Sequence, residues 1–305
     1  MKIVFVDTYT TNPGDLSWDP LSALGDLILY DRTPEEETAS RIGDADAAYV
    51  NKNEITADVM KKCPNLKFVC AAATGYDNID VRAAAAKGIA VANIPAYSTD
   101  AVAQHAFALI LEIANQVSVH KKAVDDGEWY TADDFCFSKA PLTLLTGKSL
   151  GIIGYGNIGR RVAEVALAFG MNVNIYSRDE EAAVKSDFLS LHCPLTPENR
   201  GMIDAGFISR MKDGAVLINT ARGGLVNERD LTDALKSGKL SAAGLDVLSA
   251  EPPEKPNPLI GLANCWITPH IAWTPGDIRR RIIEICAANL KSFQEGGRLN
   301  RVDPL

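Results

Sequence analysis

Three polar side chains in the second half of the chain have the chemical types that acid–base chemistry requires. Arg222 follows the apolar run 215–219, Glu251 precedes two prolines, and His270 follows the short run 266–268. A carboxylate beside an imidazole favours the protonated imidazolium, which makes the ring a better proton donor near neutral pH. The planar guanidinium of Arg222 could hold a carboxylate through two parallel hydrogen bonds.

Each of these residues also has a plain structural interpretation when it is taken singly. A histidine at a strand end is commonly a hydrogen-bonded structural residue, Arg222 could belong to a surface ion pair, and Glu251 could cap a turn. Chemistry is favoured because all three follow a nucleotide-binding pattern in the chain.

That pattern lies between residues 148 and 177 and predicts one strand, turn, helix and strand. The apolar run 149–153 ends on G-Y-G-N-I-G at residues 154–159, and apolar side chains then recur at helical spacing before a second strand at 172–176. A glycine turn can also serve plain packing of a helix on a strand. The complete unit favours dinucleotide binding.

Each glycine of the motif has a physical reason to be glycine. Gly154 would make the tight turn, Gly156 would let the backbone approach a pyrophosphate, and Gly159 would let the helix pack on the strand. The amides that open the helix, at Asn157 and Ile158, would point at the phosphates with the positive end of the helix dipole behind them.

Together the two patterns indicate the functional groups that the reduction of a 2-oxo acid requires. A nicotinamide cofactor would supply a hydride to the carbonyl carbon, His270 would give a proton to its oxygen, and Arg222 would hold the substrate carboxylate. The segments 219–224, 244–253 and 267–273 follow expected strands of the second sheet. Ligands bind at that edge in open α/β folds.

Length and composition narrow the class of protein. With 305 residues, 47% hydrophobic and 23% charged, the chain is an ordinary globular protein that is long enough for two domains. The formal net charge of -8 disfavours a nucleic-acid or anionic-membrane partner. Residues 1–7 predict a strand rather than a signal peptide, and no apolar run is long enough to span a bilayer, so a cytoplasmic location is expected.

The metal-binding residue types give no metal site. The 6 cysteines include no C-x-x-C pair and are expected to be reduced, buried thiols. The 4 histidines have no ligand spacing with them, so no metal is expected.

The first part of the chain alternates short apolar runs with helical segments, which is typical of a parallel, doubly wound α/β sheet. Strands are expected at 3–6, 27–30, 47–50, 68–72 and 89–94. Helices are expected at 34–42, 56–63 and 81–87, each with a Thr or Asp cap near its start.

The second part predicts another doubly wound parallel sheet. A long helix should begin at 98–100 and run through 119, and the aromatic-rich stretch 127–147 should pack on a second subunit or on its own sheet. Strands are expected at 188–193, 215–219, 242–247 and 266–268, with helices at 204–211 and 228–237. A terminal helix from 276 could fold back, so the expected domains are 1–98 plus 276–305, and 99–275.

From residue 74 through the terminal helix, the chain resembles the D-isomer-specific 2-hydroxyacid dehydrogenase family. The matching motifs are G-Y-G-N-I-G, S-L-H-C-P-L-T-P-E, N-T-A-R-G-G-L-V-N-E, G-L-D-V-L-S-A-E-P-P and T-P-H-I-A-W. The resemblance implies a flavodoxin-like substrate domain and a Rossmann-type cofactor domain, with a cleft between them that closes on binding. It also implies a homodimer.

The resemblance assigns roles to the matching residues. Arg222 would bind the substrate carboxylate and carbonyl, and His270 would be the acid/base with Glu251 as its partner. Asp246 would hold the nicotinamide carboxamide. Further cofactor contacts are expected at Gly154, Gly156, Asn157, Ile158, Gly159, Ser177, Arg178, His192, Cys193, Pro194, Thr220 and Ala221. Substrate contacts are expected at Asn51, Thr74, Gly75, Arg222, His270 and Trp273.

Residues 96–104 and 270–273 resemble the glycerate dehydrogenase, or hydroxypyruvate reductase, branch. Glyoxylate reductase and D-lactate dehydrogenase share the same machinery and stay open as alternatives. A phosphorylated substrate is disfavoured, because its phosphate would require several basic residues and the strand ends of the first domain offer chiefly Lys52. A cofactor-sensing corepressor is a remote alternative, because the chain lacks an extended polar tail.

The choice between NAD(H) and NADP(H) depends on the residues after the expected strand 172–176. An acidic residue there would accept a hydrogen bond from the ribose 2′-hydroxyl, whereas a 2′-phosphate wants an arginine. Ser177 and Arg178 stand at this place and lean toward NADP(H). The acidic residues 179–181 could instead turn inward and repel a phosphate.

Overall fold

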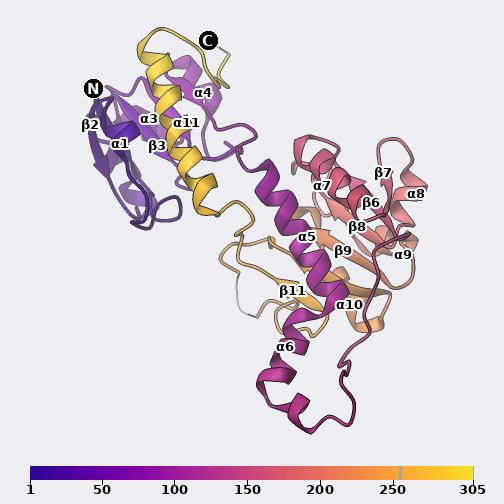
Figure 1. The fold of residues 1–305 in the computed structure, drawn as a ribbon. Helices are drawn as coiled ribbons and strands as arrows, with labels where there is room; N and C mark the ends of the chain where they lie inside the picture. Colours follow the sequence, from indigo (N-terminus) through magenta and orange to yellow (C-terminus); the bar gives the residue numbers. More distant parts are fainter. Residues whose placement is uncertain (254–255, 305) are drawn as a thin grey trace. The chain divides into compact units, whose positions relative to one another are not determined.

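The computed structural model describes residues 1–253 and 256–304, which fold into two compact α/β units (Figure 1). One unit joins Met1–Ser98 to Thr274–Leu305, and the other is Thr99–Trp273. The chain therefore leaves the first unit and later returns to it. Residue 305, at which the expected first domain ends, lies outside the described residues.

The first unit is built on a 5-stranded parallel sheet with the strand order β2-β1-β3-β4-β5. Its strands are β1 (Lys2–Phe5), β2 (Asp26–Leu29), β3 (Ala47–Val50), β4 (Phe68–Ala71) and β5 (Ala90–Ala92). β3 and β4 are buried along their whole length, as continuous apolar runs in the middle of a parallel sheet require. Each strand expected from the sequence is present, although β5 is shorter than 89–94.

Helix caps of the first unit are partly as the sequence predicts. The helices are α1 (Asp19–Ser22), α2 (Thr38–Ile42), α3 (Ala57–Lys62), α4 (Val81–Ala86) and α11 (Gly276–Gln294), with a 3-10 turn η1 (Glu35–Glu37). Thr56 caps α3 and Asp80 caps α4, each by accepting a hydrogen bond from a first-turn amide. The helix expected at 34–42 is instead η1 followed by α2, without a side-chain cap. Thr33, the threonine that precedes the expected helix, does not cap it, because its hydroxyl donates to the Val6 carbonyl.

Helix α11 packs on the first sheet, as the apolar pattern of the last residues predicts. The Tyr49 hydroxyl donates to the Cys286 carbonyl at 2.9 Å. The rings of Phe68 and Phe293 lie with their centroids 5.1 Å apart. The end of the chain thus completes the core that the beginning of the chain starts.

The second unit is built on a 6-stranded parallel sheet with the order β11-β10-β9-β8-β6-β7. Its strands are β6 (Ser149–Ile153), β7 (Asn172–Ile175), β8 (Phe188–Leu191), β9 (Ala215–Asn219), β10 (Leu240–Leu245) and β11 (Cys265–Ile267). The order reverses between β6 and β8, and such a reversal leaves a crevice at the carboxyl ends of the strands. The loops that carry the sequence motifs all begin at that edge.

One helical prediction for the second unit is wrong, and one helix was not predicted. Its helices are α5 (Thr99–Asn115), α6 (Val117–Asp125), α7 (Asn157–Ala168), α8 (Glu180–Val184), α9 (Ala205–Arg210) and α10 (Glu228–Ser237), with 3-10 turns η2 (Glu128–Thr131) and η3 (Gly223–Leu225). The single long helix through residue 119 is wrong, because Gln116 adopts a left-handed conformation, with φ 50°, between α5 and α6. Helix α8 has only 5 residues, too few for a recognisable apolar period.

Helix α6 and the chain after it project beyond the second sheet (Figure 1). This segment exposes large apolar side chains, among them Tyr130 at 94% and Phe135 at 89%. It also carries Cys136, which is exposed, so the expectation of buried thiols is wrong for this residue. Among the described residues, no group of His, Cys, Asp and Glu could hold a metal ion, and no helix is long and apolar enough to cross a membrane.

Candidate active site

The glycine turn after β6 makes close contacts on two sides and leaves space on a third. Gly154 has φ 98°, and a Cβ there would lie 2.4 Å from the amide nitrogen of Cys193. A Cβ at Gly159 would lie 2.1 Å from the carbonyl oxygen of Gly154. Both positions therefore exclude any larger residue, whereas a Cβ at Gly156 would meet nothing within 4 Å. Open space at Gly156 is what the approach of a pyrophosphate requires.

Two buried polar atoms at the same edge of the sheet lack a hydrogen-bond partner among the described residues. They are Nδ1 of His192, in the loop after β8, and Oγ1 of Thr220, in the loop after β9. The other ring nitrogen of His192, Nε2, lies 2.8 Å from the Ser190 hydroxyl, and burial lowers the pKa of His192 to about 4. The ring is therefore neutral at physiological pH. Buried polar groups are normally paired, so these two atoms fit a site for a polar ligand.

The acid–imidazole pair predicted from the sequence is present in the second unit. Nδ1 of His270 lies 2.5 Å from Oε2 of Glu251, and Oε1 of Glu251 accepts a hydrogen bond from the Leu248 amide at 3.1 Å. The carboxylate is thus held from two sides. Since it accepts the Nδ1 hydrogen, Nε2 is the ring atom that can exchange a proton with a ligand.

Asp246 holds the loop that carries His270. Its carboxylate accepts hydrogen bonds from the backbone amides of Ile271 and Ala272, each at 2.9 Å, and from the Thr268 hydroxyl at 2.6 Å. Burial would raise the pKa of Asp246, but its hydrogen bonds outweigh burial and the pKa lies below its ordinary value. The sequence gives no sign of this role, because the partners are backbone amides that only the folded sheet brings near.

Arg222 precedes η3, in the loop after β9, and is exposed. The Asn219 side chain fixes its backbone, because Nδ2 donates to the Arg222 carbonyl at 2.9 Å and Oδ1 accepts from the Ala221 amide at 3.0 Å. One guanidinium nitrogen donates to the Ala221 carbonyl at 2.8 Å. Among the residues that the structure describes, the ion pairs observed include none of Arg222.

The acidic residues after β7 have partners of their own. Asp179 caps α8 by accepting from the Ala182 amide at 3.0 Å. Glu180 pairs with Arg210 at 2.7 Å, and Glu181 lies 3.8 Å from the same guanidinium. Each of these carboxylates thus has a contact of its own in the second unit.

A different side of the glycine turn is basic. The guanidinium of Arg178 lies 5.2 Å from the ring centroid of Tyr155, and that of Arg160 lies 5.8 Å from it. Cation–π contacts of this kind hold an arginine without consuming its hydrogen-bond donors.

In the first unit, the expected substrate residues lie where β3 and β4 end. Asn51 donates to the Thr10 hydroxyl at 2.8 Å, and the Thr74 hydroxyl donates to the Ile94 carbonyl at 2.8 Å. The backbone amide of Asn51 donates to Asp7 at 2.7 Å. Burial raises the pKa of Asp7, although hydrogen bonds from the backbone amides of residues 51–53 act to lower it. The side chain of Asn51 thus holds the loop after β3, and that of Thr74 holds the loop after β4, in which Gly75 is the next residue.

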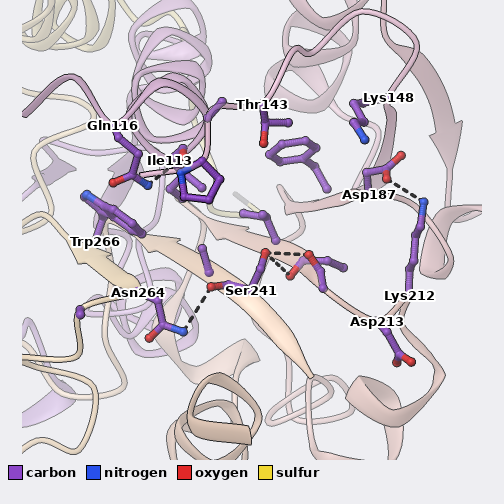
Figure 2. A pocket seen from close by; sticks show the side chains of 18 residues that line it. Ile113, Gln116, Thr143, Lys148, Asp187, Lys212, Asp213, Ser241, Asn264 and Trp266 are labelled. Carbon is purple, nitrogen blue, oxygen red and sulfur yellow. Dashed lines mark hydrogen bonds and ion pairs between the residues drawn. The ribbon is translucent and has the colours of Figure 1, made fainter. Parts of the chain in front are cut away.

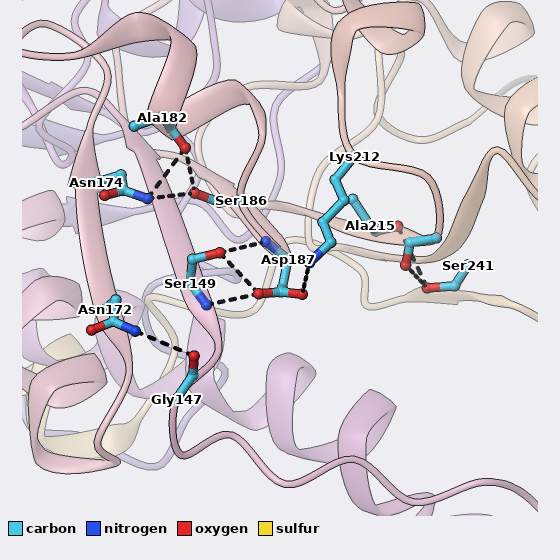
Figure 3. Close-up of polar contacts among 11 residues, drawn as sticks. Gly147, Ser149, Asn172, Asn174, Ala182, Ser186, Asp187, Lys212, Ala215 and Ser241 are labelled. Carbon is cyan, nitrogen blue, oxygen red and sulfur yellow. Dashed lines mark hydrogen bonds and ion pairs between the residues drawn. The ribbon is translucent and has the colours of Figure 1, made fainter.

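A hollow of about 450 Å³ opens at the other edge of the second sheet, where β6, β8, β9 and β10 begin (Figure 2). Within it, Asp187 accepts hydrogen bonds from the amide and hydroxyl of Ser149, both at 2.9 Å, and pairs with Lys212 at 2.7 Å (Figure 3). Burial would raise the pKa of Asp187, but these bonds lower it to about 2. Asp187 and Lys212 are therefore paired with each other inside this hollow, and the chemistry-bearing residues lie at the opposite edge.

Comparisons with known proteins agree on one family. The model for the NAD-binding domain of D-isomer specific 2-hydroxyacid dehydrogenases matches residues 107–272. A hydroxypyruvate reductase of Blautia hydrogenotrophica is 47% identical to this chain, and the match covers 99% of this chain and 100% of the relative. A solved acyclic imino acid reductase with NADPH and D-Arg has a TM-score of 0.86 at 31% identity, covering 99% of this chain and 100% of its own. A D-lactate dehydrogenase of Aquifex aeolicus with NAD and lactic acid has a TM-score of 0.83 at 32% identity, covering 99% of each chain.

Proposed function

Because the chain belongs to the D-isomer-specific 2-hydroxyacid dehydrogenase family, we propose that it interconverts hydroxypyruvate and D-glycerate. It is an oxidoreductase that acts on the CH–OH group of small D-2-hydroxy acids with a nicotinamide cofactor. The observation that carries the proposal is the 2.5 Å contact between His270 and Glu251. That pair lies in the same unit as a glycine turn whose open side suits a dinucleotide.

The cofactor would be held by the turn after β6 and by the loops after β8 and β9. The open space at Gly156 suits the pyrophosphate, and the unpartnered atoms of His192 and Thr220 could gain hydrogen-bond partners from the nucleotide. The neighbouring Cys193, Pro194 and Ala221 are proposed to line the same side. A nicotinamide cofactor bound there supplies the hydride.

The chain's own residues supply the proton and the anchor. Nε2 of the protonated His270 would donate to the carbonyl oxygen as the alcohol forms, and Glu251 would hold the ring in place through Nδ1. The N–H groups of Arg222 that the Ala221 carbonyl does not use would hold the substrate carboxylate. Asn51 and the amides of Thr74 and Gly75, in the first unit, are proposed to take part in substrate binding.

We propose a modest preference for NADPH over NADH. Arg178 stands over Tyr155 directly after β7, and its donors could bind a 2′-phosphate beside Ser177. The caps and ion pairs that occupy residues 179–181 support this, because they keep the carboxylates engaged elsewhere. Solved relatives hold NADPH in one case and NAD in another, so the family is compatible with either cofactor.

We also propose that the protein is a homodimer through α6 and the segment that follows it. The exposed rings of Tyr130 and Phe135 are large apolar surfaces of the kind that subunit contacts cover. Light scattering behind a sizing column would measure the mass in solution. A mass of one chain, 32.8 kDa, would refute the dimer.

Turnover with a panel of 2-oxo acids tests the proposed function. Hydroxypyruvate should give the highest kcat/KM, glyoxylate should come next, and 2-oxoisocaproate should be poor. The proposed reason is that Trp273, close to His270 in the chain, would put a large indole where a branched side chain needs room. A preference for 2-oxoisocaproate would refute the pocket argument, and a preference for glyoxylate or pyruvate would favour the alternative dehydrogenases. No turnover with any acid would refute the enzyme assignment itself.

A further inference from the structure

One histidine outside the proposed catalytic set contacts the structure that holds His270. His105 lies on α5, which packs against β10, and its side chain is 19% exposed. Its Nε2 lies 2.8 Å from the Thr268 hydroxyl and 3.4 Å from Oδ1 of Asp246. The Asp246 side chain itself is only 1% exposed.

The distances fix the direction of these hydrogen bonds. The Thr268 hydroxyl lies 2.6 Å from Oδ1 of Asp246, and an ionised carboxylate can only accept, so the hydroxyl hydrogen points to Asp246. The lone pairs of the same hydroxyl oxygen are then left for His105. Nε2 of His105 must therefore carry a hydrogen and donate it, which makes a chain from His105 through Thr268 to Asp246.

This chain ends on the backbone that carries His270. Besides the amides of Ile271 and Ala272, which the carboxylate of Asp246 accepts, the Asp246 carbonyl accepts the His270 amide at 2.8 Å. His270 has φ 56°, a left-handed conformation that is unfavourable for a residue with a Cβ. Such a conformation persists only where its surroundings hold it.

We propose that His105 is a positioning residue for catalysis, which acts through Thr268 and Asp246 to hold the His270 loop in its left-handed conformation. The inference rests on the proposed function only in so far as His270 is the acid/base. Its physical content is that removal of the Nε2 donor frees the Thr268 hydroxyl to rotate and takes a hydrogen-bond donor away from a buried carboxylate. The loop then samples other conformations, and Nε2 of His270 is misplaced for proton transfer.

The variants His105→Leu, His105→Gln and Gln104→Leu test this. His105→Leu removes the donor, His105→Gln keeps an N–H donor near the same place, and Gln104→Leu makes the same apolar change on an exposed neighbour of α5. With hydroxypyruvate and NADPH, His105→Leu should lower kcat about 10- to 100-fold with little change in the Kd of NADPH. The kcat of His105→Gln should stay within a factor of about three of the wild-type value. The kcat of Gln104→Leu should equal that of the wild type.

A second measurement does not depend on activity. In amide hydrogen exchange, residues 268–272 should exchange faster in His105→Leu than in the wild type, and not in Gln104→Leu. Unchanged exchange and kcat in His105→Leu would overturn the inference, and so would equal losses of kcat in His105→Gln and His105→Leu. A wild-type protein without turnover would refute the proposed function instead, and exchange at residues 268–272 would still decide whether His105 holds the loop.

Discussion

Nδ1 of His270 lies 2.5 Å from Oε2 of Glu251, although the two residues stand 19 positions apart in the chain and only the folded second unit joins them. The contact commits Nδ1 to the carboxylate and leaves Nε2 for proton exchange. The orientation of the ring is therefore set before substrate binds.

Replacement of His270 by glutamine should separate chemistry from binding. We expect His270→Gln to bind NADPH with nearly the wild-type Kd and to lose about 100- to 10,000-fold in kcat, the usual value of a positioned general acid. Single-turnover rates and a fluorescence titration of the cofactor would measure the two effects. Full activity in this variant would show that another group donates the proton.

Removal of the Arg222 guanidinium should weaken transition-state binding. Arg222→Ala should lose about 2 to 5 kcal/mol in kcat/KM, because the substrate carboxylate would be left desolvated without its partner. Arg222→Lys is the matched control, since it keeps the charge and loses the planar fork, and it should fall between the wild type and Arg222→Ala. An unchanged rate in Arg222→Ala would mean that another cation anchors the substrate.

The parts of this protein that could be predicted from the sequence are those that local patterns determine. Strands follow apolar runs, and the glycine turn is marked by its spacing between a strand and a helix. The break at Gln116 could not be predicted, because a left-handed glutamine leaves no compositional signal. Periodicity continued across it and indicated one helix.

The contacts of Asp246 are the clearest case of what the sequence cannot supply. They depend on the register in which Leu245 of β10 pairs with Ile267 of β11, which sets Asp246 beside Thr268. A family resemblance assigned Asp246 to the cofactor and gave no sign of its hold on the His270 loop. Long-range register, rather than residue type, decides such contacts.

Acid should remove the contribution of Asp187 to stability. The pKa of its carboxyl is about 2 in the folded protein against an ordinary value of 3.8. A lowered pKa stabilises the folded state above the ordinary value, and this is lost as the pH falls through 3.8 toward 2. Asp187→Asn should therefore cost up to about 2 kcal/mol in free energy of unfolding at pH 6, and less near pH 3.

Urea unfolding of the wild type and of Asp187→Asn at several pH values would measure the difference in their free energy of unfolding. Asp213→Asn is the matched control, because Asp213 pairs with Lys239 but is 91% exposed. It should change stability little at any pH. A cost for Asp187→Asn that stayed constant from pH 6 to pH 3 would contradict the electrostatic origin.

The cofactor preference should depend on the two residues that follow β7. Arg178 can present its donors to a 2′-phosphate while it rests on Tyr155, and Ser177 puts no charge against that phosphate. We expect the wild type to use both cofactors, with a modestly higher kcat/KM for NADPH. Ser177→Asp combined with Arg178→Ile should reverse the order, because the new carboxylate accepts from the ribose 2′-hydroxyl and repels a phosphate.

Steady-state kinetics with each cofactor at saturating hydroxypyruvate would measure both preferences, and Arg178→Lys is the control that keeps the positive charge. If the wild type favoured NADH by more than about a hundredfold, or roughly 2.7 kcal/mol, the acidic residues 179–181 would have to govern the site. That outcome would mean that a carboxylate accepts from the ribose, either through the Asp179 oxygen that the cap does not use or after Glu180 or Glu181 leaves Arg210. The lean toward NADPH therefore depends on these carboxylates keeping the partners that they have in the folded chain.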